Sequence, residues 1–258
     1  MEALQPLDAG DGRRRQVRQQ RPFRFAAVVV DELAHRIIGG TYREGDVLPT
    51  EQALCTELGF SRTVVREGLK LLEEQGLVQV EQGRGTTVQP RSSWDFLAPT
   101  TMRVALAYDT DLSLLDDLMF VRRVLEREMA AKAAERLTGA ELAQIEAILD
   151  AAEHAYDDYD HFRALDNAFH ASINRASGNE VGLTVVRAIH RYGDGTPPLA
   201  GGASTAKLKR TAAEHRAIYD ALAAGDGELA AERVSAHIDR SWAERRKRNK
   251  SARLLENR

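Results

Sequence analysis

The chain has 258 residues, of which 43% are hydrophobic, 29% charged and 6% aromatic, and its formal net charge is −3. This length allows two domains that each bury a core, and the composition is typical of a chain that folds mainly as helices. No apolar run is long enough to cross a bilayer, and the single cysteine, Cys55, excludes an intramolecular disulfide. We therefore expect a cytoplasmic protein without a membrane partner.

Sequence patterns divide the chain into five segments. The first lacks apolar periodicity and predicts a disordered arm that is basic at its C-terminal end. The second carries helical patterns followed by a short strand pattern, the third is a turn-rich linker, the fourth is helical throughout, and the fifth is a basic tail. These segments span residues 1–21, 22–90, 91–101, 102–245 and 246–258.

The second segment begins with three helical patterns. Apolar spacing predicts a first helix that ends at Gly39 and Gly40, with an inward face of Val28, Val29, Leu33, Ile37 and Ile38. Thr50 is expected to cap a second helix, which Gly59 ends, and Ser61 is expected to cap a third. That third helix has an exposed cationic stripe, because basic residues recur every four positions at Arg62, Arg66 and Lys70.

A short strand pattern follows the third helix. After Gly76 the sequence LVQVEQGRGTTV predicts two strands joined by the turn QGRG, with Arg84 at the tip of the hairpin. Helices of this order followed by a hairpin predict a winged helix-turn-helix, whose third helix fits the major groove of DNA. The alternative is a small helical domain whose arginine stripe is simply solvated.

Residues 45–88 closely resemble the DNA-binding head of GntR-type transcription regulators, with the elements LPTE, SRTxVRE, GLV and GRGTxV in order. The resemblance implies contacts to bases or phosphates of double-stranded DNA from Arg62, Thr63 and Arg66, and wing contacts from Gln82, Gly83 and Arg84. One position departs from the family. Gln52 stands where the family usually has an arginine, which removes one cationic contact and could alter the operator preference.

The fourth segment carries four candidate metal ligands. Asp166 and His170 lie one helical turn apart and can chelate an ion, although such a pair is more often an ion pair on a helix surface. His215 and His237 each lie eleven residues from Asp226, so an antiparallel hairpin about that break brings them level. The four predict a divalent-ion site, with zinc as the default and manganese, nickel or iron open. Each histidine taken singly also fits a partly buried residue bonded to backbone.

The same segment resembles the all-helical FCD-type effector domain of the FadR-like branch of that family, in FVRRVLEREMAAKAAERL, LDNAFHASINRASGN, EHRAIYDALAAGD and AHI. In metal-binding members of the branch one Asp and three His in this order bind the ion, and all four positions match. The resemblance also implies that Arg122 fixes a small carboxylate effector at the open positions of the ion. Arg123 could serve instead, and either could simply pair with Glu126.

The expected fold is therefore mostly α, with an N-terminal winged helix-turn-helix and a C-terminal all-α helical bundle. The expected function is that of a ligand-responsive transcription regulator and repressor that senses a small carboxylate such as a sugar acid. A homodimer would place two recognition helices on a pseudo-palindromic operator. Two alternatives stay open: a regulator that senses the metal alone, and a metal-dependent enzyme, for which we find no general base near the ligands.

Overall fold

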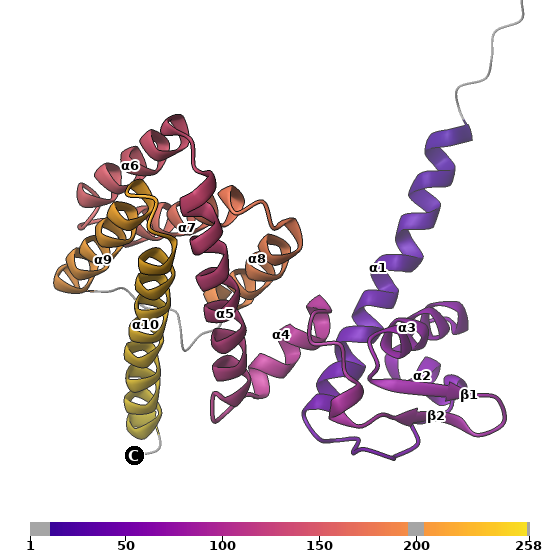
Figure 1. Ribbon diagram of the computed structural model, residues 1–258. Coiled ribbons are helices and arrows are strands. Elements are labelled where there is room, and N and C mark those ends of the chain that lie inside the picture. The colour runs from indigo at the N-terminus through magenta and orange to yellow at the C-terminus, as the bar shows by residue number, and fades with distance from the viewer. Residues whose placement is uncertain (1–10, 196–203, 257–258) are drawn as a thin grey trace, which may run out of the picture. The chain divides into compact units, whose positions relative to one another are not determined.

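The computed structural model describes residues 11–195 and 204–256, with side chains described for residues 24–191 and 204–247. The chain divides into two compact units, Met1–Tyr108 and Asp109–Arg258, and helices dominate both (Figure 1). The mostly α fold with an N-terminal winged helix-turn-helix is thus confirmed. None of the described helices is long and apolar enough to cross a membrane.

The first unit contains four α-helices, one two-stranded sheet and a short 3₁₀ turn within its described residues. In chain order these are α1 (Asp11–Ile38), α2 (Glu51–Leu58), α3 (Arg62–Glu74), β1 (Val78–Glu81), β2 (Gly85–Val88), the 3₁₀ turn (Arg91–Ser93) and α4 (Pro99–Tyr108). The strands pair antiparallel, with Val78 opposite Val88, and form the predicted wing.

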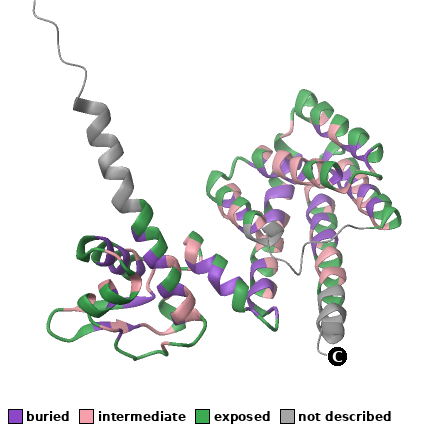
Figure 2. Ribbon diagram, turned by 180° about the vertical axis from the view of Figure 1, so that it is seen from behind, coloured by how far each residue is buried: buried purple, intermediate pink, exposed green. Residues whose placement is uncertain are grey.

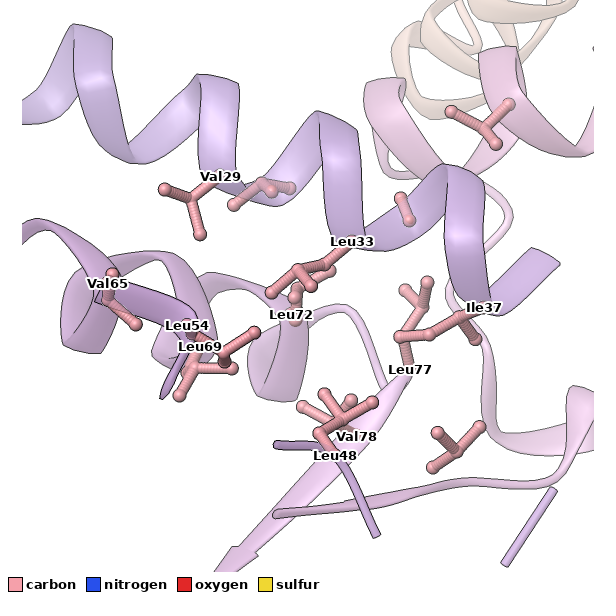
Figure 3. Close-up of a cluster of buried hydrophobic side chains, with 14 of the residues drawn as sticks. Val29, Leu33, Ile37, Leu48, Leu54, Val65, Leu69, Leu72, Leu77 and Val78 are labelled. Carbon is pink, nitrogen blue, oxygen red and sulfur yellow. The ribbon is translucent and has the colours of Figure 1, made fainter. Parts of the chain in front are cut away.

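The core of the first unit lies where α1 packs against α3 and the wing (Figure 3). Val29, Leu33 and Ile37 of α1 are buried there together with Val65, Leu69 and Leu72, which form the apolar stripe of α3. Val28 was expected on this inward face but is 51% exposed. The buried positions of α1 follow Val29 at intervals of three and four residues. This helical period turns Val28 outward.

The predicted helix ends of the DNA-binding segment are confirmed, with one difference. Thr50 Oγ1 accepts a hydrogen bond from Ala53 N at 3.2 Å at the start of α2, and Gly59 ends α2 with a φ of 72°. Ser61 occupies the N-cap position of α3, but its side chain makes no capping hydrogen bond. Ser61 therefore marks the start of α3 through its extended backbone alone.

The structure places two of the chain's outer segments differently from the sequence expectation. Residues 1–21 were expected to be a disordered arm, but α1 begins at Asp11, and residues 1–10 lie outside the described residues. Arginine and glutamine, which fill this stretch, are good helix formers. The expected basic tail, residues 246–258, likewise continues the last helix as far as Glu256.

The expected linker, residues 91–101, is an ordered part of the first unit. Asp95 N donates to Gln75 O at 2.9 Å, and Thr101 Oγ1 donates to Gln75 Oε1 at 2.9 Å. Val104 of α4 is fully buried in the core formed by α1 and α3. The second unit consequently begins at Asp109 rather than at residue 102, because the apolar face of α4 is buried against α1.

The second unit is a helical bundle in which buried and exposed faces alternate around each helix (Figure 2). Its helices are α5 (Ser113–Arg136), α6 (Gly139–Glu153), α7 (Tyr159–Ala176), α8 (Glu180–Gly195), α9 (Thr205–Ala223) and α10 (Gly227–Glu256). Helices α5, α7, α9 and α10 pack around a core that contains the fully buried Phe169 and Ile218. Phe169 of this core stacks on His215, one of the candidate metal ligands, with ring centroids 4.4 Å apart.

We expect Gly76→Ala to destabilise the first unit more than Gly40→Ala. Both glycines have a left-handed backbone, with φ of +71° and +84°, so alanine at either position costs about 1–2 kcal/mol of strain. Only at Gly76 would the added Cβ also clash with a backbone atom, Ser93 O, so the segment after the wing must move. Urea unfolding followed by Trp94 fluorescence in a Trp242→Phe background measures both losses, and equal losses would contradict this packing.

Candidate metal centre and DNA-reading surface

Three helices of the second unit bring the four predicted metal ligands together. Asp166 and His170 project from α7, His215 from α9 and His237 from α10, and one donor atom of each lies within 4.8 Å of the others. His215 Nε2 lies 3.3 Å from His237 Nε2 and 3.4 Å from Asp166 Oδ1. The hairpin geometry inferred from the sequence is therefore present.

The turn between α9 and α10 sets the register of the two hairpin histidines. Gly225 has a φ of 70°, and Asp226 Oδ1 accepts a hydrogen bond from Leu229 N at 3.0 Å, which starts α10. Asp226 N also donates to Ala221 O at 3.0 Å, which closes the end of α9. The two helices therefore leave the turn with equal lengths of chain between Asp226 and each histidine.

The cluster has the donor chemistry of a divalent-ion site. His170 Nε2 is buried and has no hydrogen-bond partner among the described residues, and an unpaired buried nitrogen is costly unless something binds it. Ligands of a tetrahedral zinc ion at the usual bond length lie about 3.3 Å apart, which agrees with the spacing of the donors of Asp166, His215 and His237. The residues present thus fit such an ion.

Two carboxylates that were not identified as site residues from the sequence orient the histidines. Glu126 of α5, which is 1% exposed, has Oε2 at 2.9 Å from His170 Nδ1. Glu214 of α9 has Oε2 at 2.8 Å from His237 Nδ1. Since a carboxylate accepts the Nδ1 proton, each contact leaves Nε2 unprotonated for an ion, as in carboxylate–histidine–metal arrangements.

Glu126 also binds two residues outside the ligand set. Arg122 Nε donates to Glu126 Oε1 at 2.7 Å, and His190 Nε2 lies 3.2 Å from the same oxygen. Arg123, the alternative to Arg122, instead pairs with Asp239 at 3.5 Å. The buried carboxylate of Glu126 thus joins helices α5, α7 and α8 around one ligand of the cluster.

Burial and charge favour the protonation states that an ion requires. Burial, together with the neighbouring His237, holds the pKa of His215 well below its usual value, and burial also lowers the pKa of His170. Burial opposes ionisation of Asp166, but the surrounding imidazoles and Arg122 hold its pKa at about 2. Burial thus favours the neutral imidazole form of His170 and His215, and Asp166 offers a carboxylate; these are the ligand forms that bind metals.

A cavity of about 60 Å³ adjoins the cluster and is rich in cations and hydroxyl groups. Arg122, Asp166 and His237 line it from the cluster side. The other polar side chains in its wall are Tyr159, Arg163, Lys207, Thr211, Ser241 and Arg245. A small anion with hydroxyl groups would match this lining.

A second cavity, of about 260 Å³, lies between α7 and α8 and is mainly apolar. His170 and His190 line it together with Ala171, Leu183 and Val186. His190 thus lies in a pocket wall.

The predicted DNA-contacting residues of the recognition helix, Arg62, Thr63 and Arg66, are all exposed on α3. Arg66 binds Glu51 of α2 through two hydrogen bonds, Nε to Oε1 at 3.1 Å and Nη2 to Oε2 at 2.8 Å. This pairing lowers the pKa of Glu51. Arg62 is held in the same way by Gln52, whose Oε1 accepts from Nε at 3.0 Å and from Nη2 at 2.5 Å.

The predicted wing residues Gln82, Gly83 and Arg84 form the exposed loop between β1 and β2. Gly83 has a φ of 81°, which a side chain would strain. The side chain of Arg84 is 82% exposed and lies 3.3 Å from Glu81. The wing therefore presents one cation at its tip, as expected from the sequence.

We expect the thermal stability of the metal-free protein to fall as the pH drops below about 6.5, the ordinary pKa of histidine. Because the pKa of His215 is lowered on folding, the unfolded chain binds more protons below about pH 6.5, so stability is present above that pH and lost below it. The carboxylates lose their contributions only at lower pH. Calorimetry of chelator-treated protein should show that the melting temperature of His215→Phe depends less on pH than that of wild type. His154→Asn, which changes an exposed histidine, should keep the wild-type dependence. Equal slopes for His215→Phe and wild type would contradict the proposed cause.

Glu126→Gln is expected to weaken metal binding about 10- to 100-fold, because an amide orients His170 less strongly than a carboxylate does. Glu128→Gln, on the same helix but exposed, is the matched control and should bind like wild type. Competition with a chromophoric chelator measures the affinities, and circular dichroism checks that both variants fold. An unchanged affinity for Glu126→Gln would show that Glu126 does not support the site.

Comparisons with known proteins agree with this two-part organisation. The family described as bacterial regulatory proteins, gntR family, matches residues 25–88, and the FCD domain matches residues 117–240. The Escherichia coli galactonate operon transcriptional repressor is 31% identical over 202 residues, which cover 78% of this chain and 88% of that protein. The Escherichia coli Glc operon transcriptional activator is 34% identical over 168 residues, 63% of this chain and 64% of that protein.

A solved structure of Lar, which controls the agr system of Listeria monocytogenes, shares the fold with a TM-score of 0.53 at 20% identity. The match covers 88% of this chain and 96% of Lar. The matched families and these relatives are transcription regulators rather than enzymes, as the winged helix-turn-helix predicted. The chain belongs to the GntR family of bacterial transcription regulators, in the FadR-like group that carries an FCD domain.

Proposed function

We propose that this DNA-binding regulator senses a small hydroxy acid or sugar acid through a divalent ion held by Asp166, His170, His215 and His237. The observation that supports this proposal most directly is the small cavity beside that cluster, whose wall combines four cationic side chains with three hydroxyl groups. Zinc is the default ion for one carboxylate and three imidazoles, and manganese, nickel or iron can use the same donors.

The position of Arg122 supports its assignment as the effector-binding residue. Arg122 lines the cavity beside Asp166 and His237, is only 14% exposed and has its Nε bonded to Glu126. The Nη atoms of an arginine held in this way can bind a carboxylate in the cavity. An ion with four protein ligands and a preference for five or six adds an attraction for the same small acid.

The relatives support the class of effector. One of them is named as the repressor of the galactonate operon, and galactonate is a sugar acid. This relative is also the reason to favour repression, since the chain covers 88% of it, whereas it covers 64% of the Glc operon activator. Release of the operator on acid binding is the mode that we propose.

We propose DNA contacts from the exposed residues of the first unit that match the family pattern. On α3 these are Arg62, Thr63 and Arg66, and on the wing they are Gln82, Gly83 and Arg84; Gln52 of α2, where the family usually has an arginine, is exposed beside Arg62. Exposed arginines on a helix of this length can pair with guanine in the major groove. The cation at the wing tip can reach the phosphate backbone.

A homodimer is part of the proposed function. Phe120, Val121 and Val124 of α5 form an exposed apolar face, with exposures of 58%, 40% and 42%. An exposed apolar face of this kind favours burial against another surface, and a twofold copy would place two recognition helices on a pseudo-palindromic operator. An effector can shift an equilibrium only between two states that it binds with different affinities. The acid must therefore bind one dimer arrangement more tightly than another.

A factorial titration tests the function. Affinity capture of genomic fragments first supplies the operator, and anisotropy of a labelled operator duplex is then measured with metal alone, acid alone and both. We expect galactonate or a related acid to weaken binding only when metal is present. Release by metal alone would establish the metal-sensing alternative, and no release by any of a panel of acids would overturn the proposal.

Arg122→Lys should lower the potency of the acid about tenfold, equivalent to about 1.4 kcal/mol, because lysine keeps the charge but not the two-pronged geometry. Arg123→Lys, one residue away and paired with Asp239, is the matched control and should respond like wild type. Both variants should bind the operator normally without acid. A larger effect in Arg123→Lys would transfer the role to Arg123.

A further inference from the structure

We propose that Gln52 is a specificity-determining residue that sets the base preference of the recognition helix by positioning Arg62. Gln52 is exposed on α2, and Arg62 is the first residue of α3. The inference rests on the proposed DNA contact of Arg62 and adds a role for the residue beside it. In this role Gln52 acts through Arg62 rather than by replacing the cationic contact that the family arginine supplies.

The hydrogen bonds define how Arg62 is held. Gln52 Oε1 accepts from both Nε and Nη2 of Arg62, at 3.0 Å and 2.5 Å. A guanidinium group only donates, so the amide must turn its oxygen to Arg62 and its NH₂ group away. Two donors on one acceptor fix both the position and the plane of the guanidinium group.

The occupied edge of Arg62 limits how it can meet a base. With the Nε and Nη2 edge bound to Gln52, the end of the guanidinium group that carries Nη1 and the second Nη2 proton is left for a ligand. Two parallel donors at that end match O6 and N7 of guanine in the major groove. Arg62 is therefore oriented for an end-on contact with guanine. Because its side chain is already ordered, it loses less conformational entropy when DNA binds.

The neighbouring pair shows why an amide matters at this position. Glu51 holds Arg66 by the same Nε and Nη2 edge, so two adjacent residues of α2 hold the two arginines of α3 alike. The carboxylate of Glu51 compensates the charge of Arg66 directly, whereas Arg62 is bound by the neutral amide of Gln52 and meets Glu51 only through a weaker coulombic attraction. Arg62 thus keeps more of its attraction for DNA than Arg66 does, while its geometry is restricted.

An arginine at position 52 would have the opposite effect. Two guanidinium groups at this distance repel each other, and neither has an acceptor to offer the other. Arg62 would lose its fixed plane, and the surface would gain a second cation that can contact a phosphate or a base itself. Gln52 accordingly favours one fixed guanine contact by Arg62, which an arginine at position 52 would not support.

Selection of a randomised operator library by the full-length protein tests this inference. Four proteins are compared: wild type, Gln52→Ala, Arg62→Ala and the double variant. We expect wild type to select guanine strongly at one position of each half-site, and Arg62→Ala to reduce that preference about 5- to 150-fold. Gln52→Ala should reduce it at the same position by a smaller factor than Arg62→Ala does, and the double variant should match Arg62→Ala alone.

Salt dependence separates a positioning role from a loss of charge. Gln52→Ala should keep the wild-type salt slope because no charge is removed, whereas Arg62→Ala should lower the slope by about one per subunit. Gln52→Arg should raise the slope by about one per subunit and weaken the guanine preference. Gln144→Ala, an exposed glutamine of α6, is the matched control for the substitution itself and should select like wild type.

Other results of the operator selection would contradict either the DNA contact of Arg62 or the role of Gln52. If Arg62→Ala keeps the guanine preference, the proposed DNA contact of Arg62 fails, and the role of Gln52 fails with it. If Arg62→Ala abolishes the preference but Gln52→Ala keeps it, only the role of Gln52 fails. If Gln52→Ala lowers the preference further in the absence of Arg62, Gln52 touches DNA itself and does not act through Arg62.

Discussion

The second unit depends on the compensation of one buried carboxylate, Glu126. A carboxylate that is 1% exposed is costly unless it is paired and hydrogen-bonded, and Glu126 finds partners on three helices. Arg122 comes from its own helix α5, His170 from α7 and His190 from α8. The packing of these helices, the orientation of a candidate metal ligand and the position of the candidate effector residue therefore share one physical cause.

This sharing has a consequence for signalling. Arg122 and His190 bind the same oxygen of Glu126, while His170 faces the other oxygen. A ligand that draws Arg122 away from Glu126 changes the hydrogen bonding of His170, and the reverse also holds, because linkage between two binding events is reciprocal. The mainly apolar cavity between α7 and α8 adjoins the same network through His170 and His190.

In the first unit, too, a few residues hold several side chains in place on the DNA-reading side. Helix α2 supplies Glu51 and Gln52, which hold the two arginines of α3 at its surface. At the other end of α3, Gln75 binds the segment that follows the wing. The same short helices thus orient the arginines and anchor α4, whose Val104 completes the core.

The sequence by itself determined the winged helix-turn-helix, the ends of α2 and the four candidate ligands. These follow from local spacing, since a helical turn brings Asp166 beside His170, and equal chain lengths from Asp226 bring His215 beside His237. Only the tertiary structure decided the roles of Glu126 and Glu214, the boundary after Tyr108 and the Gln52–Arg62 contact. Most of these depend on packing between elements, which periodicity along one helix does not specify. The Glu214–His237 pair lies within the hairpin, but it requires a particular rotation of α9 against α10, and spacing along the chain does not determine that rotation.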